Sequence, residues 1–300
     1  MRACIIFNPT ARGNKARRLQ QSLNATAGRC TLYPTPGPGT AQGLAASAVQ
    51  EGFDTIIAAG GDGTINEVVN GLAQTRDGLE RARLGVLALG TVNVFAKELG
   101  LPSDLNLAWR AIENGQELRV DLPQVEFTRD GVRCRSVFVQ LAGAGLDSRA
   151  IAFVNWKLKT WLGPGAYVWA GVKAMIGPQP RVIALIDDRE VSGELVLIGN
   201  GRYYGGRIEL FPGASMTDGR LEVRVFAQAN AAAVLGLGLD WLWRRPVAKI
   251  PGLYFQASTV TLQSSESVPF ELDGDNVGAL PAKFSIAPRA LRVMAPTAPH

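Results

Sequence analysis

The stretch IIAAGGDGTINEVVNGL, residues 56–72, joins an apolar run to three glycines around one aspartate and then to a helical pattern. The apolar residues after Thr64 recur at i, i+3, i+4 and i+7, which is the spacing of one buried helix face. Thr64 and Glu67 have the spacing of a capping box, in which each side chain bonds a backbone amide at the helix start. The sequence therefore predicts a strand, a glycine turn and a helix that begins at Thr64, with Ile65, Val68, Val69 and Leu72 buried.

The glycine turn has the composition of a phosphate site. Gly60, Gly61 and Gly63 allow the backbone to approach a ligand closely, and the amides and dipole of a helix start favour an anion. Asp62 would repel a phosphate unless a divalent cation lay near both, and Mg²⁺ prefers carboxylate and phosphate oxygens. Asp62 therefore indicates a metal, or a network that holds one. A plain Gly-Asp loop is the alternative for GGDG taken alone.

A second strand, turn and helix are predicted at residues 83–102, RLGVLALGTVNVFAKELGLP. Gly90 occupies the turn, and Thr91 is the expected helix cap. The expected apolar stripe consists of Val92, Phe95, Ala96 and Leu99. Turns at the ends of neighbouring parallel strands meet in one crevice, so we expect both turns to bind one ligand. The segment NPTARGNK, residues 8–15, would supply a third loop there, or else a surface turn around Pro9.

The order of the predicted elements indicates two domains. In the first third of the chain, strands alternate with helices, which is typical of an α/β domain with a parallel sheet. The strands are expected at residues 3–8, 29–35, 53–60 and 83–90, and the helices at 40–52, capped by Thr40, and from Asn14 onward. After about residue 120, short alternating runs predict a mostly antiparallel second domain. These runs are 119–128, 134–143, 180–187, 193–200, 219–227, 258–264, 268–275 and 282–288, with a two-part helical insertion at 152–177.

The composition narrows the possible functions. A net charge of +5 and a pI near 9.3 suit anionic partners, but without a nucleic-acid motif no nucleic-acid partner is expected. Three cysteines argue against a disulfide framework or a zinc site and fit a cytoplasmic location. The one histidine is His300, so any general base has to be a carboxylate or a lysine. No apolar run is long enough to predict a signal peptide or a membrane span.

Five segments in a fixed order resemble the diacylglycerol kinase catalytic domain family, which includes sphingosine and ceramide kinases. They are FNPTARG, GGDGTINEVVNGL, GTVNVFAKELGLP, GNGRYYGGRIELFPGASMTDGRLEV and ELDGD. GGDGT also occurs in NAD kinases and phosphofructokinases, whereas the ordered set is specific, and the likeness covers residues 3–295. The resemblance implies an NAD kinase-like nucleotide-binding α/β domain at 1–119, with 286–300 packing back on it. It also implies a lipid-binding β-sandwich at 120–285.

The resemblance implies ATP- and Mg²⁺-dependent phosphorylation of a lipid hydroxyl. The family's ATP-contacting positions correspond to Asn8, Pro9, Thr10, Ala11, Arg12, Thr35, Gly61, Asp62, Gly63, Thr64, Asn66, Glu67 and Thr91, beside Gly60, Gly90 and Asn93. Its magnesium site in the C-terminal domain corresponds to Asp218 with backbone oxygens of Ser215 and Arg220, and Asp121 matches a carboxylate of the water and metal network around the phosphates. Asp275 stands where the family has its proton acceptor and is the expected base, with Asp62 in support. A β-turn role is the alternative for Asp275.

Two residues depart from the family pattern. Relatives commonly have GTxND, whereas Val94 follows Asn93 here. Val94 lies off the predicted stripe, so we expect it to face the crevice where a metal-network carboxylate would stand. The chain also ends the ELDGD segment in Asp275, where several relatives have the longer glutamate. Neither change abolishes the expected chemistry, but the first puts one metal contact and the substrate in question.

A kinase of lipids is expected to touch a membrane peripherally, on its inner surface. Amphipathic rings and cations gather at Trp156, Lys157, Lys159, Trp161, Tyr167 and Trp169, and again at residues 239–246. Packing of these tryptophans on the sandwich is the alternative. Assembly as a homodimer is left open.

The leading hypothesis is a lipid kinase that converts diacylglycerol to phosphatidate. A kinase of a sphingoid base, ceramide or another lipid alcohol is an alternative that the sequence hardly separates. Val94 motivates a second alternative, a nucleotide-binding regulator with weakened catalysis. An NAD kinase is disfavoured by GNGRYYGG and by the tryptophan-rich segments.

Overall fold

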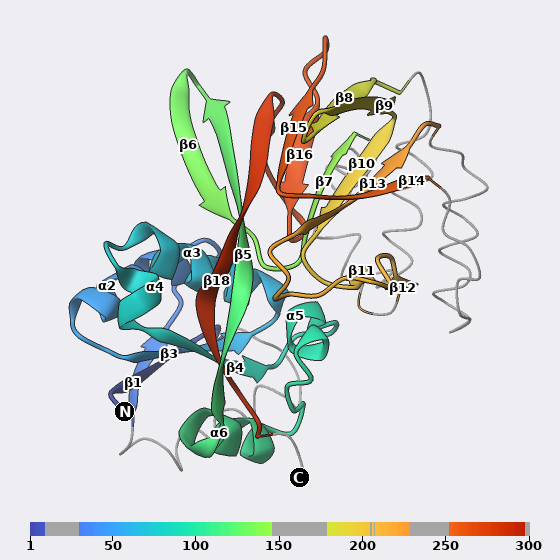
Figure 1. The fold of residues 1–300 in the computed structure, drawn as a ribbon. Helices are drawn as coiled ribbons and strands as arrows, with labels where there is room; N and C mark the ends of the chain where they lie inside the picture. The colour runs from blue at the N-terminus through green and yellow to red at the C-terminus, as the bar shows by residue number, and fades with distance from the viewer. Residues whose placement is uncertain (10–29, 146–178, 205, 207, 229–251, 298–300) are drawn as a thin grey trace, which may run out of the picture. The chain divides into compact units, whose positions relative to one another are not determined.

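A computed structural model describes residues 1–9, 30–145, 179–204, 206, 208–228 and 252–297 of the chain (Figure 1). The fold divides into two compact units. Unit 1 comprises Met1–Leu122 with Pro288–His300, and unit 2 comprises Pro123–Ala287. The helix expected from Asn14, the two-part insertion at 152–177 and the segment 239–246 lie outside the described residues.

Unit 1 is built on a parallel sheet with the strand order β2-β1-β3-β4. Its strands are β1 (Ala3–Phe7), β2 (Cys30–Pro34), β3 (Thr55–Gly60) and β4 (Arg83–Ala88). β3 is buried along its whole length, and β1 and β4 over most of theirs, as expected for strands covered on both faces. The structure thereby confirms the predicted α/β architecture.

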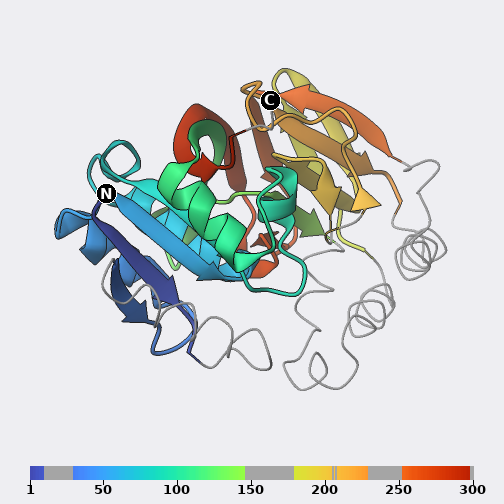
Figure 2. The ribbon, with the colours of Figure 1, turned by 90° about the horizontal axis from the view of Figure 1, so that it is seen from below.

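Helices cover the sheet of unit 1. They are α2 (Ala41–Gln50), α3 (Asp62–Gln74), α4 (Gly78–Arg81), α5 (Val94–Glu98) and α6 (Leu105–Asn114). α6 packs Ala108 and Ile112 against Ile5, Ile57 and Leu87 of one sheet face, the face seen in Figure 2. α2 and α3 lie together on the opposite face (Figure 1). The predicted stripe of α3 is confirmed, because Ile65, Val68, Val69 and Leu72 are fully buried.

α6 was not predicted from the sequence. Its N-cap is Asp104, whose Oδ1 atom accepts hydrogen bonds from the amides of Asn106 and Leu107, each at 3.0 Å. An acidic N-cap of this kind satisfies amides that the helix itself leaves unpaired. The helix buries Ala108, Ala111 and Ile112 on one face.

Unit 2 contains a six-stranded antiparallel sheet with the order β14-β13-β10-β7-β16-β17. The strands are β14 (Leu253–Ala257), β13 (Leu221–Phe226), β10 (Leu195–Gly199), β7 (Leu141–Gly145), β16 (Pro269–Leu272) and β17 (Asp275–Ala279). A two-stranded ribbon, β11 (Tyr203–Tyr204) with β12 (Ile208–Glu209), belongs to the same unit.

A second antiparallel layer of unit 2 packs on that sheet. It is formed by β6 (Val132–Val137), β8 (Val182–Ile186), β9 (Arg189–Gly193) and β15 (Thr259–Gln263), with parts of β5 (Gln116–Arg129) and β18 (Ala282–Ala295). Alternate residues of both layers form one core, in which Phe127, Phe270 and Phe284 make edge-to-face contacts. The predicted antiparallel β-sandwich is therefore confirmed, although β9, β14 and β17 were not predicted.

One predicted strand was wrong. The run at residues 134–143 was expected to be continuous, but β6 ends at Val137 and β7 begins at Leu141. Between them the amides of Val139 and Gln140, and that of Leu141, donate to the carboxylate of Asp273 at 2.8–2.9 Å. A side chain thus replaces a neighbouring strand as the acceptor, and the ladder is interrupted.

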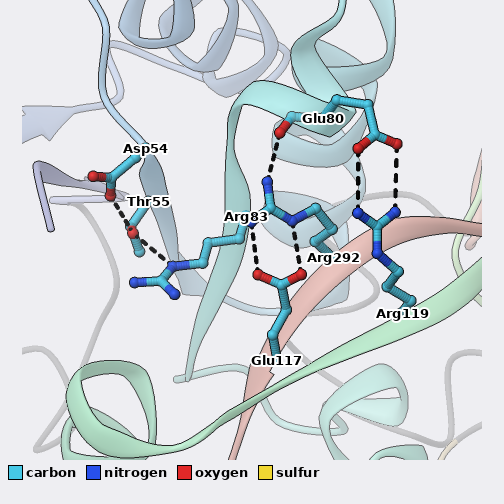
Figure 3. A network of polar contacts seen from close by, with 7 residues as sticks. All are labelled: Asp54, Thr55, Glu80, Arg83, Glu117, Arg119 and Arg292. Carbon is cyan, nitrogen blue, oxygen red and sulfur yellow. Dashed lines mark hydrogen bonds and ion pairs between the residues drawn. The ribbon is translucent and has the colours of Figure 1, made fainter.

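The C-terminal strand of unit 1 is held by a network of ion pairs and hydrogen bonds between side chains (Figure 3). Arg292 of β18 donates two bonds to the carboxylate of Glu117 on β5, at 2.7 and 2.8 Å, and a third to the carbonyl of Glu80. Arg119 pairs with the Glu80 carboxylate at 3.2 Å. The hydrogen bond from Arg292 is the main reason that the pKa of Glu117 is lower than usual. β18 also pairs with β4 through Val293 and Leu84, so the last residues complete the first sheet.

Candidate active site

The carboxyl ends of the parallel strands lie in one row at one edge of the sheet. Pro34, Phe7, Ala59 and Leu87 are paired in register across β2, β1, β3 and β4. The loops after these strands therefore all leave the same edge, where open α/β sheets bind ligands. The structure brings to this edge the predicted residues Asn8, Pro9, Thr35, Gly60–Glu67 and Gly90–Asn93, whereas Thr10, Ala11 and Arg12 lie outside the described residues.

The two glycine turns touch each other. The carbonyl of Gly60 accepts hydrogen bonds from the amides of Leu89, at 2.8 Å, and Gly90, at 3.2 Å. A Cβ atom on Gly90 would lie 2.6 Å from Cα of Gly61, so the approach excludes any side chain at Gly90. The prediction that the two turns converge is confirmed, and contact between the backbones is the reason that Gly90 is a glycine.

The first turn of α3 offers amides to a ligand. The helix begins at Asp62 with Gly61 as its N-cap, two residues before the predicted start at Thr64. Its first intrahelical bond runs from the Ile65 amide to the Gly61 carbonyl, at 3.1 Å. The amides of Asp62, Gly63 and Thr64 have no acceptor within the described part of the chain, as usual for a first turn. A Cβ atom on Gly63 would meet nothing within 4 Å, so the turn is open at this position.

The predicted capping box at Thr64 and Glu67 is wrong. α3 has no side-chain cap, and the Glu67 carboxylate instead accepts bonds from the amides of Gly39, at 2.9 Å, and Ala41, at 2.8 Å. Glu67 thus caps the neighbouring helix α2. Thr40 occupies the N-cap position of α2 as predicted, but its hydroxyl donates to the carbonyl of Gly37 rather than accepting from the helix. Glu67 reaches the start of α2, and not that of its own helix, because α2 and α3 pack side by side. A Cβ atom on Gly71 of α3 would lie only 2.4 Å from the carbonyl oxygen of Gln42 in α2.

The second helix also begins differently from the prediction. α5 starts at Val94, and its N-cap is Asn93 in a left-handed conformation with φ 53°, not Thr91. Val92 precedes the helix and is 45% exposed, so it does not belong to the buried stripe, which consists of Phe95 and Ala96. Asn93 donates to the carbonyl of Gly90 at 2.8 Å. Its Oδ1 atom is buried and has no hydrogen-bond partner among residues that the structure describes.

Asp62 joins the two turns. Its Oδ1 atom accepts a hydrogen bond from the amide of Phe95, in the first turn of α5, at 3.2 Å. The carboxylate therefore performs the capping that no side chain of the second turn performs. Sequence periodicity could not reveal this partner, which is 33 residues away. The open amides beside Asp62 and the unpartnered Asn93 oxygen fit a polyphosphate with a cation and its bound waters.

Asp275 lies at the start of β17 in unit 2, where its side chain is exposed. A two-residue turn precedes it, with φ 48° at Asp273 and 93° at Gly274, as in the turns that join antiparallel strands. Asp273 was missed from the sequence, yet its carboxylate accepts the three amides of residues 139–141. Buried Glu271 accepts the amide of Gly274 at 2.7 Å. The hairpin that carries Asp275 is thus fixed by two further carboxylates.

The residues expected to bind magnesium lie in two places. In unit 2, Ser215, Asp218 and Arg220 share one exposed turn, in which Asp218 accepts the amide of Arg220 at 2.9 Å. In unit 1, Asp121 is buried and accepts the amide of Arg289 at 2.7 Å. Over the residues that the structure describes, no group of three or more His, Cys, Asp or Glu side chains could hold a metal by itself. A magnesium ion bound by any of these residues would need further oxygen ligands from a bound phosphate, which is usual for Mg²⁺.

Sequence comparison decides the family. Residues 2–125 match the model of the diacylglycerol kinase catalytic domain, and residues 140–295 match the YegS C-terminal NAD kinase beta sandwich-like domain. A diacylglycerol kinase of Bacillus subtilis is 33% identical over 303 residues, which cover 98% of this chain and 96% of that protein. The chain belongs to the diacylglycerol kinase family. The diacylglycerol kinase of Staphylococcus carnosus is 32% identical, with 98% and 95% covered.

The fold of this diacylglycerol kinase family member agrees with solved structures. A putative diacylglycerol kinase from Bacillus anthracis superposes with a TM-score of 0.78 at 22% identity, covering 98% of this chain and 95% of that chain. Yeast NADH kinase superposes with a TM-score of 0.58 at 11% identity, covering 98% and 83%. The family member is accordingly an enzyme of the lipid kinase class with an NAD kinase-like fold. Among its described residues, no helix has the length and apolarity that crossing a bilayer requires.

Proposed function

We propose that this enzyme transfers the γ-phosphate of ATP to the hydroxyl of diacylglycerol, with Mg²⁺, and so forms phosphatidate. One structural observation carries the nucleotide site: the open first turn of α3 meets the second glycine turn at the carboxyl edge of the sheet. The names of the relatives favour diacylglycerol as the acceptor.

The residues of unit 1 would hold the phosphates by backbone contacts. The amides of Asp62, Gly63 and Thr64 would donate their N–H groups to the phosphate oxygens, and the dipole of the 13-residue helix would add to the attraction. Asn93 offers a buried oxygen to a hydroxyl or a bound water. Bound Mg²⁺ neutralises charge on the transferred phosphoryl group. Asp62 and Asp121 of unit 1 would bind it directly or through water. A separate magnesium site within unit 2 would use Asp218 with backbone oxygens of Ser215 and Arg220.

Asp275 would remove the proton from the lipid hydroxyl. A hydroxyl is a weak nucleophile, and a positioned carboxylate can take up its proton as the bond to phosphorus forms. Asp275 is exposed at the hairpin of β16 and β17, whereas Asp273 and Glu271 of the same hairpin already accept backbone amides. Asp275 is therefore the carboxylate of this hairpin best placed to receive a proton.

Two alternative functions each have a specific basis. A sphingoid base, ceramide or another lipid alcohol would use the same phosphate site, because the amides of Asp62–Thr64 would bind the phosphates and not the acceptor lipid. A nucleotide-binding regulator is suggested by Val94, which stands where relatives commonly have a carboxylate. The lipid substrate resides in a membrane, so the enzyme would act in the cytoplasm at the inner membrane surface, as a monomer or a homodimer.

A lipid-panel assay tests the proposal. Purified enzyme is incubated with ATP carrying a radiolabelled γ-phosphate and with mixed micelles of diacylglycerol, ceramide, sphingosine or monoacylglycerol, with Mg²⁺ or with a chelator. We expect label in phosphatidate, dependent on Mg²⁺, and no labelling of added NAD. Labelling of another lipid alone would correct the acceptor. ATP binding without transfer to any lipid would support the regulator.

A further inference from the structure

The helices α2 and α3 both begin at the carboxyl edge of the sheet. Every helix start leaves backbone amides that attract an anion. At α3 these amides lack an acceptor in the described part of the chain. At α2 the Glu67 carboxylate already accepts the amides of Ala41 and Gly39, at 2.8 and 2.9 Å. A carboxylate of the chain itself therefore occupies the start of α2, whereas the start of α3 is open to a ligand.

Glu67 also fixes the loop between β2 and α2. This loop, Thr35–Thr40, contains Pro36 and Pro38, which have no N–H group to donate. Its beginning is held by the Thr35 amide, which donates to the carbonyl of Phe7 at 2.8 Å. Its end is held by the Gly39 amide, which donates to Glu67. The far half of the loop is thus attached to α3 through a single carboxylate.

The attachment matters because of where Glu67 stands. It lies one turn beyond Thr64 on α3, so one helix carries both the open amides and the group that holds the loop. We propose that Glu67 is a positioning residue for the nucleotide. It holds the loop Thr35–Thr40 at a fixed position relative to the amides of Asp62–Thr64. This rests on the proposed nucleotide site. In this proposal Glu67 acts through the loop, in place of the direct ATP contact that the family resemblance implies for it.

The same helix pair offers a matched control. Next to Ala41 in the first turn of α2, the side-chain amide of Gln42 donates at 2.5 Å to Gln74, the last residue of α3. Gln74→Ala removes a hydrogen bond between the same two helices but leaves the loop and the open amides untouched. A general loosening of the helix pair would affect both variants, whereas loss of loop position would affect only variants of Glu67.

The test compares Glu67→Ala, Glu67→Gln and Gln74→Ala by steady-state kinetics and by calorimetric titration with Mg-ATP. We expect Glu67→Ala to raise the KM and Kd for ATP about tenfold, with kcat changed less than about twofold, since two charge-assisted bonds are lost. Glu67→Gln should lie between, because its amide oxygen can accept one of the two bonds. Gln74→Ala should lower the melting temperature without changing either constant.

Amide hydrogen exchange gives a readout that does not depend on activity. In Glu67→Ala, exchange at residues 36–44 should become faster, while exchange in β3 stays as in the wild type. Wild-type exchange in this segment, or equal KM shifts in Glu67→Ala and Gln74→Ala, would overturn the proposal. A loss of kcat at unchanged KM would overturn it as well, by placing Glu67 at the reacting groups. Failure of the lipid-panel assay would instead count against the kinase reaction, and the exchange and titration data would still judge Glu67.

Discussion

The Oδ1 atom of Asp62 lies 3.2 Å from the backbone nitrogen of Phe95 and accepts its hydrogen bond. This contact connects the turn after β3 to the helix after β4. The aspartate of the GGDG turn thus has a structural partner in the protein itself. A metal role remains open to its second oxygen, for which the described residues supply no partner.

Asp62→Ala and Asp62→Asn separate the two roles of this carboxylate. Loss of the cap in Asp62→Ala should lower the free energy of unfolding by about 1 kcal/mol. Asp62→Asn keeps an acceptor for the Phe95 amide, so its stability should stay near the wild type. Both should lose most kinase activity if the charge serves the metal. Full activity in Asp62→Asn, measured over a range of Mg²⁺ concentrations, would show that Asp62 only caps α5 and does not serve the metal.

Val94→Asp tests the departure from the family pattern. The new carboxylate would stand at the first residue of α5, next to Phe95, whose amide binds Asp62. Two carboxylates near each other repel unless a cation lies between them. We expect Val94→Asp to melt lower than the wild type without Mg²⁺ and to gain more stability when Mg²⁺ is added. An Mg²⁺ shift equal to that of the wild type would show that residue 94 does not face the metal. Val94→Asn is the uncharged control.

Asp273 and Asp275, two residues apart, should respond in opposite ways. Asp273→Ala leaves three amides of buried residues without an acceptor, so the free energy of unfolding should fall by about 3 kcal/mol or more. Asp275→Asn removes an exposed carboxylate and should leave the melting temperature unchanged while lowering kcat by about 10²–10⁴-fold. Denaturant melts and the lipid assay measure both. Because Asp273→Ala could fail to fold, Asp273→Asn, which keeps one acceptor oxygen, is examined beside it.

The ion pair of Arg292 and Glu117 should stabilise unit 1 in a pH-dependent way. The pKa of Glu117 is lowered from its ordinary value of 4.5, chiefly by the hydrogen bond from Arg292. A lowered pKa in the folded state means that the stabilisation is fully present above about pH 4.5 and is lost as the pH falls through the folded-state value. Arg292→Ala should therefore cost about 1–2 kcal/mol at pH 7 and less at pH 3.

Urea melts at both pH values measure this difference. Arg119→Ala is the control, because its partner Glu80 is solvent-exposed and the pair should add little. A cost of Arg292→Ala that is the same at both pH values would assign its effect to packing or to its bond with the Glu80 carbonyl.

Much of the fold could be predicted because its signals are local. The buried stripe of α3 follows from residues three and four apart, and the strands β1, β3 and β4 are continuous apolar runs. β14 was missed because its exposed Leu253 and Tyr254 give no clean alternation. α6 was missed even though Ala108, Ala111 and Ile112 have the spacing of one buried helix face.

The sequence by itself determined the parallel sheet, the antiparallel second unit and the glycine turns, because each depends on neighbours within a few residues. Only the tertiary structure decided which carboxylate accepts a hydrogen bond from which unpaired backbone amide. Glu67 caps a helix 26 residues earlier, Asp62 caps one 33 residues later, and Asp273 holds amides more than 130 residues before it. A carboxylate bonds the unpaired amide that packing brings within 3 Å or so, and no periodicity along the chain encodes that proximity.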